Sequence, residues 1–331
     1  MDCKKICIIH LNQIGDLVFS LPLLKSLRDQ FPQAVIHSIV KPYLSELLKD
    51  SPYVDEIYFR ESGFASKLRL LKKIRKNNYD LLISLSRSEE CLGMASFSNA
   101  GIKAGFPGFP WKPFFNVKET IDGHNSWYNN SKLLKALGIP VSKNDYVGLI
   151  RAEVTTDNLF LPERFVVISP GASKRRLTKN WDEEKFADLI FLLYEKFDLI
   201  PVLVGSAANV ASNKIIEDYF LKIAGGDKTK LVNFSGKINL RALCAIIKKA
   251  ALFVGIDSGV MHLASSLDIP VVGLFGPTDP FYVGPQNEKS IVVKSETLEC
   301  VPCYLKDCNH RNCMRLLSVQ SVMNACETLI K

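Results

Sequence analysis

Short runs of β-branched and other apolar residues alternate with helix-length amphipathic segments along the first half of the chain. The strand-like runs are residues 6–11, 34–40, 54–59 and 79–85. Helical periodicity is found between them at residues 21–30, 42–49 and 64–76. An alternation of this kind builds right-handed βαβ units on a parallel sheet.

The pattern weakens and then starts again in the second half. Residues 101–123 are rich in Gly, Pro and aromatic residues, so we expect an irregular loop there. After a polar stretch at 151–158 the alternation resumes, and the chain closes with an expected helix at 319–330. The later strand-like runs are residues 165–169, 199–204, 231–234, 252–256 and 271–275. The helical segments are residues 182–197, 210–223, 240–250 and 260–267.

Two successive doubly wound α/β domains are the simplest interpretation. We expect one Rossmann-like domain over residues 1–155 and a second over residues 160–315. The remaining C-terminal helix, residues 316–331, is expected to pack back on the N-terminal domain.

The composition agrees with a folded protein and excludes several other classes. Of the 331 residues 47% are hydrophobic and 23% are charged, with 19 Gly and 16 Pro, so the chain is neither disordered nor collagenous. No stretch reaches the ~20 uninterrupted apolar residues of a membrane-spanning helix. Residues 6–27 also lack the continuous apolar region of a signal peptide. We therefore expect a cytoplasmic protein.

The formal net charge is +8, from 42 basic and 34 acidic residues. This excess is too mild to indicate a nucleic-acid partner, and none is expected. It suits an anionic small molecule or an anionic membrane face.

Small and polar residues follow three of the expected strands, at the edge where open parallel sheets bind ligands. In the first of these places, residues 10–16, a glycine allows a tight turn and Asp16 lands at the start of the next helix. An isolated Gly-Asp pair is most often a helix cap, because Asp interacts well with the helix dipole. The functional alternative is a general base that takes a proton from a hydroxyl group.

The second place is the basic loop at residues 169–181, which leads into a helix N-terminus. Lys174, Arg175, Arg176 and Lys179 surround its small residues with positive charge. Such a loop could be a solvated surface loop. Backbone N–H groups, the helix dipole and these cations could also converge on one anion, for which a phosphate or diphosphate is the natural ligand.

The third place is residues 254–264, where a strand runs through Asp257, Ser258 and Gly259 into a helix that carries His262 in its first turn. A lone histidine is by default packed in a core. Here Ser258 and Gly259 present N–H groups to an anion, and His262 could bind phosphate oxygens or the Asp257 carboxylate. A further loop at 275–280 ends the next strand on the same edge.

Several motifs are absent. The chain has no G-x-x-x-x-G-K-[ST] phosphate loop, and no G-x-G-x-x-G follows a strand. It also lacks H-E-x-x-H and G-x-S-x-G. These absences weigh against a P-loop NTPase, a dinucleotide dehydrogenase, a zinc protease and an α/β-hydrolase.

Taken together, the motifs resemble glycosyltransferase family 9, the lipopolysaccharide heptosyltransferases. The segments that carry the resemblance are I-G-D-L-V-F-S-L-P at 14–22, P-G-A-S at 170–173, K-N-W at 179–181, D-S-G-V-M-H-L-A at 257–264, F-G-P-T-D at 275–279 and the C-x-x-C at 300–303. The resemblance implies a GT-B fold, with two Rossmann-like domains facing across a central cleft. It also implies inverting, metal-independent transfer of heptose from ADP-heptose to a lipopolysaccharide core or a related lipid-linked surface glycan.

In that family the acceptor binds the N-terminal domain and the nucleotide sugar binds the C-terminal domain. The resemblance makes Asp16 the candidate catalytic base and places the donor on Lys179, Ser173 and the Asp-Ser-Gly…His motif. The motif residues are Asp257, Ser258, Gly259 and His262. One departure is that residues 205–210 carry no carboxylate for the ribose, where Asn209 could be a neutral substitute.

Two other functions stay open on the sequence alone. One is another GT-B activity, such as a nucleotide-sugar epimerase or a transferase that uses another nucleotide sugar. An epimerase needs a second acid/base group, for which there is no strong candidate beside Asp16. The other is a non-catalytic protein that binds nucleotide sugars.

The helical segment 64–76 carries Phe64, Leu68, Leu71 and Ile74 at helical spacing among six basic residues. A surface helix with a solvated basic face is the simpler interpretation. The same face could also attract the anionic inner leaflet of the inner membrane. The protein would then be a peripheral protein on that leaflet.

Four of the nine cysteines fall within 14 residues, at Cys300, Cys303, Cys308 and Cys313. A leading C-x-x-C is typical of thiolate sites for zinc or iron, but the second half lacks a matching pair. We expect no cofactor to be required. The cluster is either a set of buried or surface thiols in a loop, with at most one adventitious disulfide, or a structural metal site.

Overall fold

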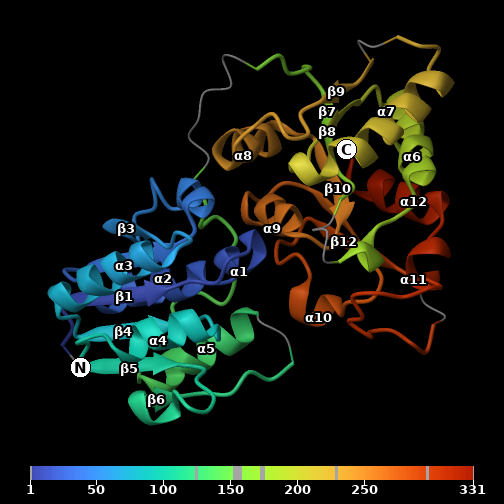
Figure 1. Ribbon diagram of the computed structural model, residues 1–331. Coiled ribbons are helices and arrows are strands. Elements are labelled where there is room, and N and C mark those ends of the chain that lie inside the picture. The colour runs from blue at the N-terminus through green and yellow to red at the C-terminus, as the bar shows by residue number, and fades with distance from the viewer. Residues whose placement is uncertain are drawn as a thin grey trace. The chain divides into compact units, whose positions relative to one another are not determined.

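The computed structural model describes residues 2–123, 126–151, 159–171, 176–227, 230–295 and 298–330. The chain divides into two units, Met1–Arg151 and Ala152–Lys331, each with its own sheet of six parallel strands (Figure 1). Among the described residues, no helix is both long and apolar enough to cross a bilayer.

The sheet of the first unit has the strand order β3-β2-β1-β4-β5-β6. Ile6 of the central strand β1 lies opposite Ile36 of β2 and Leu81 of β4. The strands are β1 (Lys5–Ile9), β2 (Val35–Val40), β3 (Glu56–Phe59), β4 (Leu81–Ser84), β5 (Ile102–Gly105) and β6 (Val117–Lys118). The helices are α1 (Ile14–Val18), α2 (Leu21–Gln30), η1 (Pro42–Leu47), α3 (Phe64–Asn77), α4 (Glu89–Ser96), η2 (Lys112–Phe114) and α5 (Trp127–Ala136). The order reverses between β1 and β4, and open α/β sheets bind ligands at the carboxyl ends of such strands.

The second unit repeats this winding, with the order β12-β11-β10-β7-β8-β9 and its reversal between β7 and β10. Its strands are β7 (Phe165–Ser169), β8 (Ile200–Leu203), β9 (Val232–Asn233), β10 (Leu252–Ile256), β11 (Val271–Phe275) and β12 (Ser290–Lys294). Its helices are η3 (Leu177–Lys179), α6 (Glu183–Phe197), η4 (Ala207–Asn209), α7 (Val210–Ile223), α8 (Leu240–Lys249), α9 (Gly259–Ser266), α10 (Pro280–Val283), α11 (Asn312–Arg315) and α12 (Val319–Leu329). Both sheets have the Rossmann strand order, as the alternating pattern predicts.

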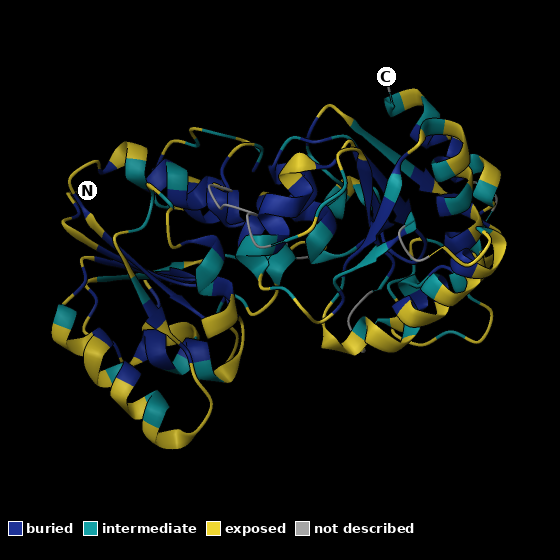
Figure 2. Ribbon diagram, turned by 90° about the horizontal axis from the view of Figure 1, so that it is seen from above, coloured by how far each residue is buried: buried dark blue, intermediate teal, exposed yellow. Residues whose placement is uncertain are grey.

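The central strands form the core of each unit. Every residue of β4, β7, β10 and β11 is buried, which is typical of parallel strands covered on both faces. Figure 2 shows the central strands mostly in dark blue, while the outer sides of the helices are exposed. Loops that leave the carboxyl ends of these strands therefore start from fixed points.

Four parts of the fold differ from the sequence-based expectation. Residues 101–123 are not wholly irregular, because β5 pairs with β4 and β6 pairs with β5. β12 was also missed. β5 and β6 are short and contain lysine or glycine, so their pairing depends on the neighbouring strand rather than on an apolar run of their own.

The last helix, α12, is part of the second unit rather than a separate segment. Its residues Val322, Met323 and Cys326 are buried in the same apolar cluster as α6 and the second sheet. The apolar stripe of α12 completes that core, which is why the helix packs there.

Helix α3 buries a different stripe from the expected one. Ile74 is buried together with Leu70, whereas Phe64 is 77% exposed and Leu68 is 43% exposed. Leu70 and Ile74 are four residues apart, so they share one face of the helix and direct Phe64 and Leu68 away from the sheet.

Candidate active site

Three loops at the carboxyl edge of the second sheet bring together a lysine, an aspartate and a threonine. Asp257 follows β10, Thr278 lies beyond β11, and Lys179 ends the short turn η3 beyond β7. Asp257 Oδ2 accepts hydrogen bonds from Lys179 Nζ at 2.5 Å and from Thr278 Oγ1 at 2.6 Å. Lys179 Nζ also lies 3.5 Å from the Asp257 carbonyl oxygen. An ammonium group has three donors, so among the described residues one donor of Lys179 remains for a ligand.

His262 lies beside this cluster, in the first turn of α9, and is 3% exposed. Burial lowers the pKa of His262 to about 4, with Lys179 acting in the same direction and Asp257 opposing it. The imidazole is therefore neutral near pH 7 and has one N–H to donate. A neutral histidine can donate that hydrogen bond to a phosphate oxygen.

Ser258 is the N-cap of α9, but its side chain makes no capping hydrogen bond. Its Oγ atom is buried and has no hydrogen-bond partner among the described residues. A serine at this position normally satisfies a first-turn N–H of its own helix. Here the hydroxyl and the first-turn N–H groups are available to an anion at the positive end of the helix.

The K-N-W motif joins a core anchor to a functional lysine. Trp181 is 2% exposed, packs edge-to-face on Phe186 with ring centroids 4.9 Å apart, and donates from Nε1 to the Leu317 carbonyl at 3.0 Å. Lys179 is two residues away on the adjoining turn. The buried indole therefore fixes where the lysine can reach.

The segment at 303–305 ties the loops of this site together. Thr178 Oγ1 donates to the Leu305 carbonyl at 2.8 Å, and Arg176 Nη1 donates to the Tyr304 carbonyl at 3.1 Å. The backbone N–H groups of Cys303 and Tyr304 both donate to the Pro277 carbonyl. The loops that follow β7 and β11 are thus both hydrogen-bonded to the same short segment, residues 303–305, of the cysteine-rich region.

The glycines that follow β7 and β8 lie so close to the Asn209 side chain that a Cβ atom would clash with it. A Cβ on Gly171 would lie 2.1 Å from Asn209 Nδ2, and one on Gly205 would lie 2.8 Å from Asn209 Cβ. Asn209 Oδ1 already accepts hydrogen bonds from the Ser206 N–H at 3.0 Å and from its hydroxyl at 2.9 Å. The Asn209 side chain, which was expected to bind the ribose, therefore stabilises the turn at Ser206 through its Oδ1 atom. Ser173 lies outside the described residues.

Asp16 lies in the first unit, in the first turn of α1, directly beyond the central strand β1. It is half-buried, and burial raises the pKa of its carboxyl group to about 6. Burial raises the pKa of Tyr43 and the Asp16 charge raises it further, so the two side chains are near one another. A carboxylate with a pKa near 6 is a suitable general base at neutral pH.

The loop that carries α1 is anchored by residues that the motifs did not reveal. Arg60, which is 1% exposed, donates from Nη2 to the His10 carbonyl at 3.3 Å and to Asn12 Oδ1. Tyr43 donates to the Asn12 carbonyl. His10 is itself held between Ser20 Oγ at 2.9 Å and Ser38 Oγ at 3.1 Å. The position of α1 therefore depends on β2, β3 and η1 as well as on β1.

Comparison with known proteins assigns this arrangement to a family. The model of glycosyltransferase family 9 (heptosyltransferase) matches residues 67–314, which include Lys179, Asp257 and His262. The chain belongs to glycosyltransferase family 9.

Members of family 9 are similar to this chain over nearly its whole length, in sequence and in fold. The chain is 26% identical to lipopolysaccharide heptosyltransferase 3 of Escherichia coli K12, covering 96% of this chain and 95% of the relative. A family 9 glycosyltransferase from Veillonella parvula superposes with a TM-score of 0.80 at 23% identity, covering 99% of this chain and 97% of that one. ADP-heptose LPS heptosyltransferase II of E. coli gives a TM-score of 0.78 at 23% identity, with 98% of both chains covered. The fold of this family 9 chain is the GT-B fold.

Apart from Ser173, the sequence-predicted residues of the second unit are brought together, with one addition. Lys179, Asp257 and His262 form one cluster, and Ser258 with Gly259 begins the adjacent helix. Thr278 was not singled out, although its loop was recognised as part of the same edge. Its contact with Asp257, 21 residues away in the chain, leaves no local signal in the sequence.

The four cysteines of the cluster are free thiols of different exposure in this family 9 chain. All nine cysteines are free, with Cys300 exposed and Cys313 buried. Within the described ranges, no three His, Cys, Asp or Glu side chains are placed to hold a metal ion. Burial raises the pKa of the Cys313 thiol, and the other cysteines of the cluster add to this effect, so they lie in its neighbourhood. The structural metal site on these cysteines therefore stays a prediction from the sequence.

Proposed function

We propose that this family 9 member transfers heptose, with inversion and without a metal ion, from ADP-heptose to a lipopolysaccharide core or a related lipid-linked surface glycan. The observation that carries the proposal is the cluster of Lys179, Asp257 and His262 beside the unused hydroxyl of Ser258. The names of the heptosyltransferase relatives support the sugar and the nucleotide.

The donor diphosphate is proposed to bind at the N-terminus of α9. The free donor of Lys179, the His262 N–H, the Ser258 hydroxyl and the Gly259 N–H would hydrogen-bond its oxygens. Charge builds on the leaving diphosphate in the transition state, so donors fixed in advance stabilise that state more than the ground state. Asp257 and Thr278 orient the lysine. Ser173 is proposed as a further donor contact.

The acceptor is proposed to react in the first unit, with Asp16 as its base. The acceptor oxygen forms a bond to C1 of the heptose while the bond from C1 to the diphosphate oxygen breaks. The hydroxyl proton passes to the Asp16 carboxylate, and ADP departs with the electron pair. Attack from the face opposite the leaving group inverts the configuration at C1.

The test is an assay of the purified chain with ADP-heptose and heptose-deficient lipopolysaccharide core. Product analysed by mass spectrometry should gain one heptose, and NMR should show inversion at C1. Parallel reactions contain EDTA, and UDP- and GDP-sugars replace ADP-heptose as controls. Donor binding without transfer indicates a non-catalytic binding protein, and release of an epimerised sugar indicates an epimerase. Either result overturns the proposal.

A further inference from the structure

One side of helix α3 combines exposed apolar residues with cations that have no acidic partner. Phe64, at 77% exposure, and Leu68, at 43%, lie one turn apart on its outer side. Within the described part of the chain, no carboxylate lies within 4.0 Å of the basic groups of four exposed residues. These are Arg69, Lys72, Arg75 and Lys76. A buried stripe cannot account for Phe64 and Leu68, because Leu70 and Ile74 fill it.

A second exposed apolar group lies on helix α4 and the loop that follows β5. The rings of Phe97, Trp111 and Phe114 are in mutual contact, with centroids 6.0–6.4 Å apart. Phe97 is 52% exposed and Phe114 is 46% exposed. Phe109, in the same loop, is 94% exposed. Clustered aromatic rings at this level of exposure usually mark an interaction surface.

The two groups adjoin on the same side of the first sheet. Leu70 and Ile74 of α3 share one apolar cluster with the buried face of α4, and Trp111 packs against that cluster. Lys67 of α3 pairs with Glu90 of α4 at 3.2 Å. We call this side the α3–α4 face. It consists of α3, α4 and the loop at 109–114.

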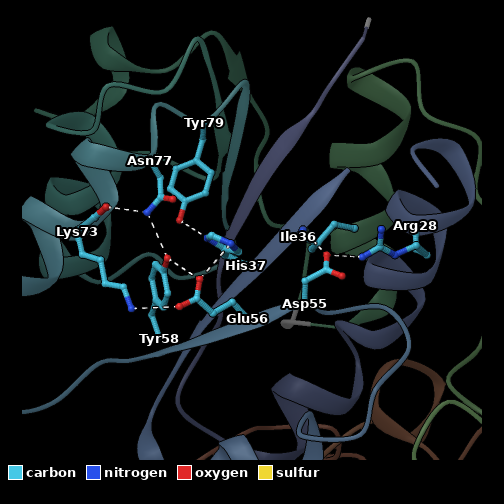
Figure 3. Close-up of polar contacts among 9 residues, drawn as sticks. All are labelled: Arg28, Ile36, His37, Asp55, Glu56, Tyr58, Lys73, Asn77 and Tyr79. Carbon is cyan, nitrogen blue, oxygen red and sulfur yellow. Dashed lines mark hydrogen bonds and ion pairs between the residues drawn. The ribbon is translucent and has the colours of Figure 1, made fainter. Parts of the chain in front are cut away.

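The carboxylates around the α3–α4 face are largely engaged, which leaves its cations in excess. Figure 3 shows Glu56 held by Lys73 at 3.3 Å and by the Tyr58 hydroxyl at 2.9 Å. Glu90 is paired with Lys67, and Glu89 accepts the indole N–H of Trp111. Glu61, in the loop before α3, is exposed, and Glu61 and Glu89 each offset one positive charge.

We propose that the α3–α4 face docks on an anionic lipid bilayer. Phe64, Leu68 and Phe109 would enter the interfacial region while the basic side chains reach the lipid head groups. The composition favours a bilayer over a protein partner, because lysine is depleted from protein interfaces whereas aromatic and basic residues together suit a lipid surface. The inference rests on the proposed function in one respect: a lipid-linked acceptor is presented at such a surface.

Sedimentation with vesicles tests the docking directly. The chain should bind vesicles of phosphatidylglycerol and phosphatidylethanolamine but not vesicles of phosphatidylcholine, and binding should weaken as salt rises. Each cation near an anionic surface contributes about fivefold to partitioning. The quadruple variant R69Q/K72Q/R75Q/K76Q should therefore lose at least a hundredfold in binding. The double variant F64S/F109S should lose binding without changing the salt dependence.

The matched control removes four exposed lysines of the second unit, in the variant K222Q/K249Q/K294Q/K306Q. It has the same net charge as the α3 variant and should bind vesicles as the wild type does. If both quadruple variants bind equally well, or equally poorly, the α3–α4 face is not the docking surface. A wild-type dimer in sedimentation velocity that F64S/F109S abolishes would show instead that the face joins two copies.

Activity separates this inference from the proposed function. The α3 variant should keep wild-type transfer to a deacylated, water-soluble acceptor and lose transfer to the same glycan in vesicles. A chain without any transferase activity but with salt-sensitive vesicle binding overturns the function and leaves the docking surface. If the wild-type chain transfers heptose but does not bind vesicles, the docking surface is overturned and the proposed function stands.

Discussion

Lys179 Nζ lies 2.5 Å from Asp257 Oδ2, although the two residues are 78 positions apart in the chain. Both side chains are largely buried, at 15% and 6% exposure. The pair therefore fixes an ammonium group at the carboxyl edge of the sheet before any ligand arrives. This preorganisation is what an electrostatic role in transfer requires.

Removing either member of this pair should have unequal effects on binding. K179M should weaken ADP binding by at least tenfold, because a charged hydrogen bond contributes about 1.5–3 kcal/mol. D257N should keep more of the affinity, since Asn still accepts a hydrogen bond from Lys179. Isothermal titration of ADP measures both. Equal affinity of K179M and wild type would remove Lys179 from the donor site.

The variant D16N should retain donor binding and lose turnover. A positioned general base contributes about 10²–10⁴-fold in rate, and an amide cannot accept the proton. ADP-heptose affinity and kcat, measured on the same preparation, separate the two properties. Ordinary turnover by D16N would exclude Asp16 as the base.

The pH dependence of kcat/KM should show an acid limb near pH 6. Burial raises the pKa of Asp16 to about 6, so the carboxylate form that takes the proton dominates above this pH and is lost below it. The rate should fall tenfold per pH unit below about 5. The residual activity of D16N should lack this limb, whereas K222Q, a surface variant, should keep it.

His10 should make the first unit less stable in acid. Burial, assisted by Arg60, lowers the pKa of His10 from 6.5 to about 3 in the folded state. Below pH 6.5 the unfolded chain therefore binds a proton that the folded chain does not. Stability is highest above pH 6.5 and falls by up to about 1.4 kcal/mol per pH unit towards pH 3.

Thermal midpoints of wild type and H10Q between pH 7.5 and 5 measure this contribution. Asp16, whose folded pKa is raised, acts in the opposite direction, so the difference between the two proteins is the informative quantity. H10Q should be less stable at pH 7.5 and should lose less of its stability at pH 5. Parallel curves for the two proteins would contradict the assignment.

Trp181 should link core packing to the donor site. W181A removes a buried indole and its bond to Leu317, at a cost of about 3–5 kcal/mol. W181F keeps most of the packing and should lose about 1 kcal/mol for the hydrogen bond. Both variants should bind ADP more weakly than their stability alone explains, because η3 is no longer fixed. Chemical denaturation and ADP titration give the two measurements.

The fold could be predicted to the extent that its strands are continuous apolar runs. β1, β7, β10 and β11 have that character, and their alternation with helices is enough to indicate two doubly wound sheets. β5 and β6 could not be found in this way, because short strands at the edge of a sheet take their structure from a neighbour. Which side of α3 faces the sheet was likewise set by packing, since Leu70 competes with Phe64 and Leu68 for the core.

The candidate site was predictable where it follows the local sequence pattern. Lys179, Asp257 and His262 stand beside glycines and helix starts, which the sequence displays. Arg60 and Thr278 act through contacts with residues distant in the chain, and no local pattern announces such contacts. The role of Ser258 required the structure as well, because an unused capping hydroxyl looks like any other serine in a sequence.

The hydrogen bond from Trp181 to the Leu317 carbonyl has a consequence for biosynthesis. A ribosome that has translated the chain through β12 has already made Lys179, Asp257, His262 and Thr278. It has not yet made the carbonyls at 304–305 and 317 that hold η3 and the indole. Nascent chains should therefore acquire their affinity for nucleotide only after residues 304–317 have emerged from the exit tunnel.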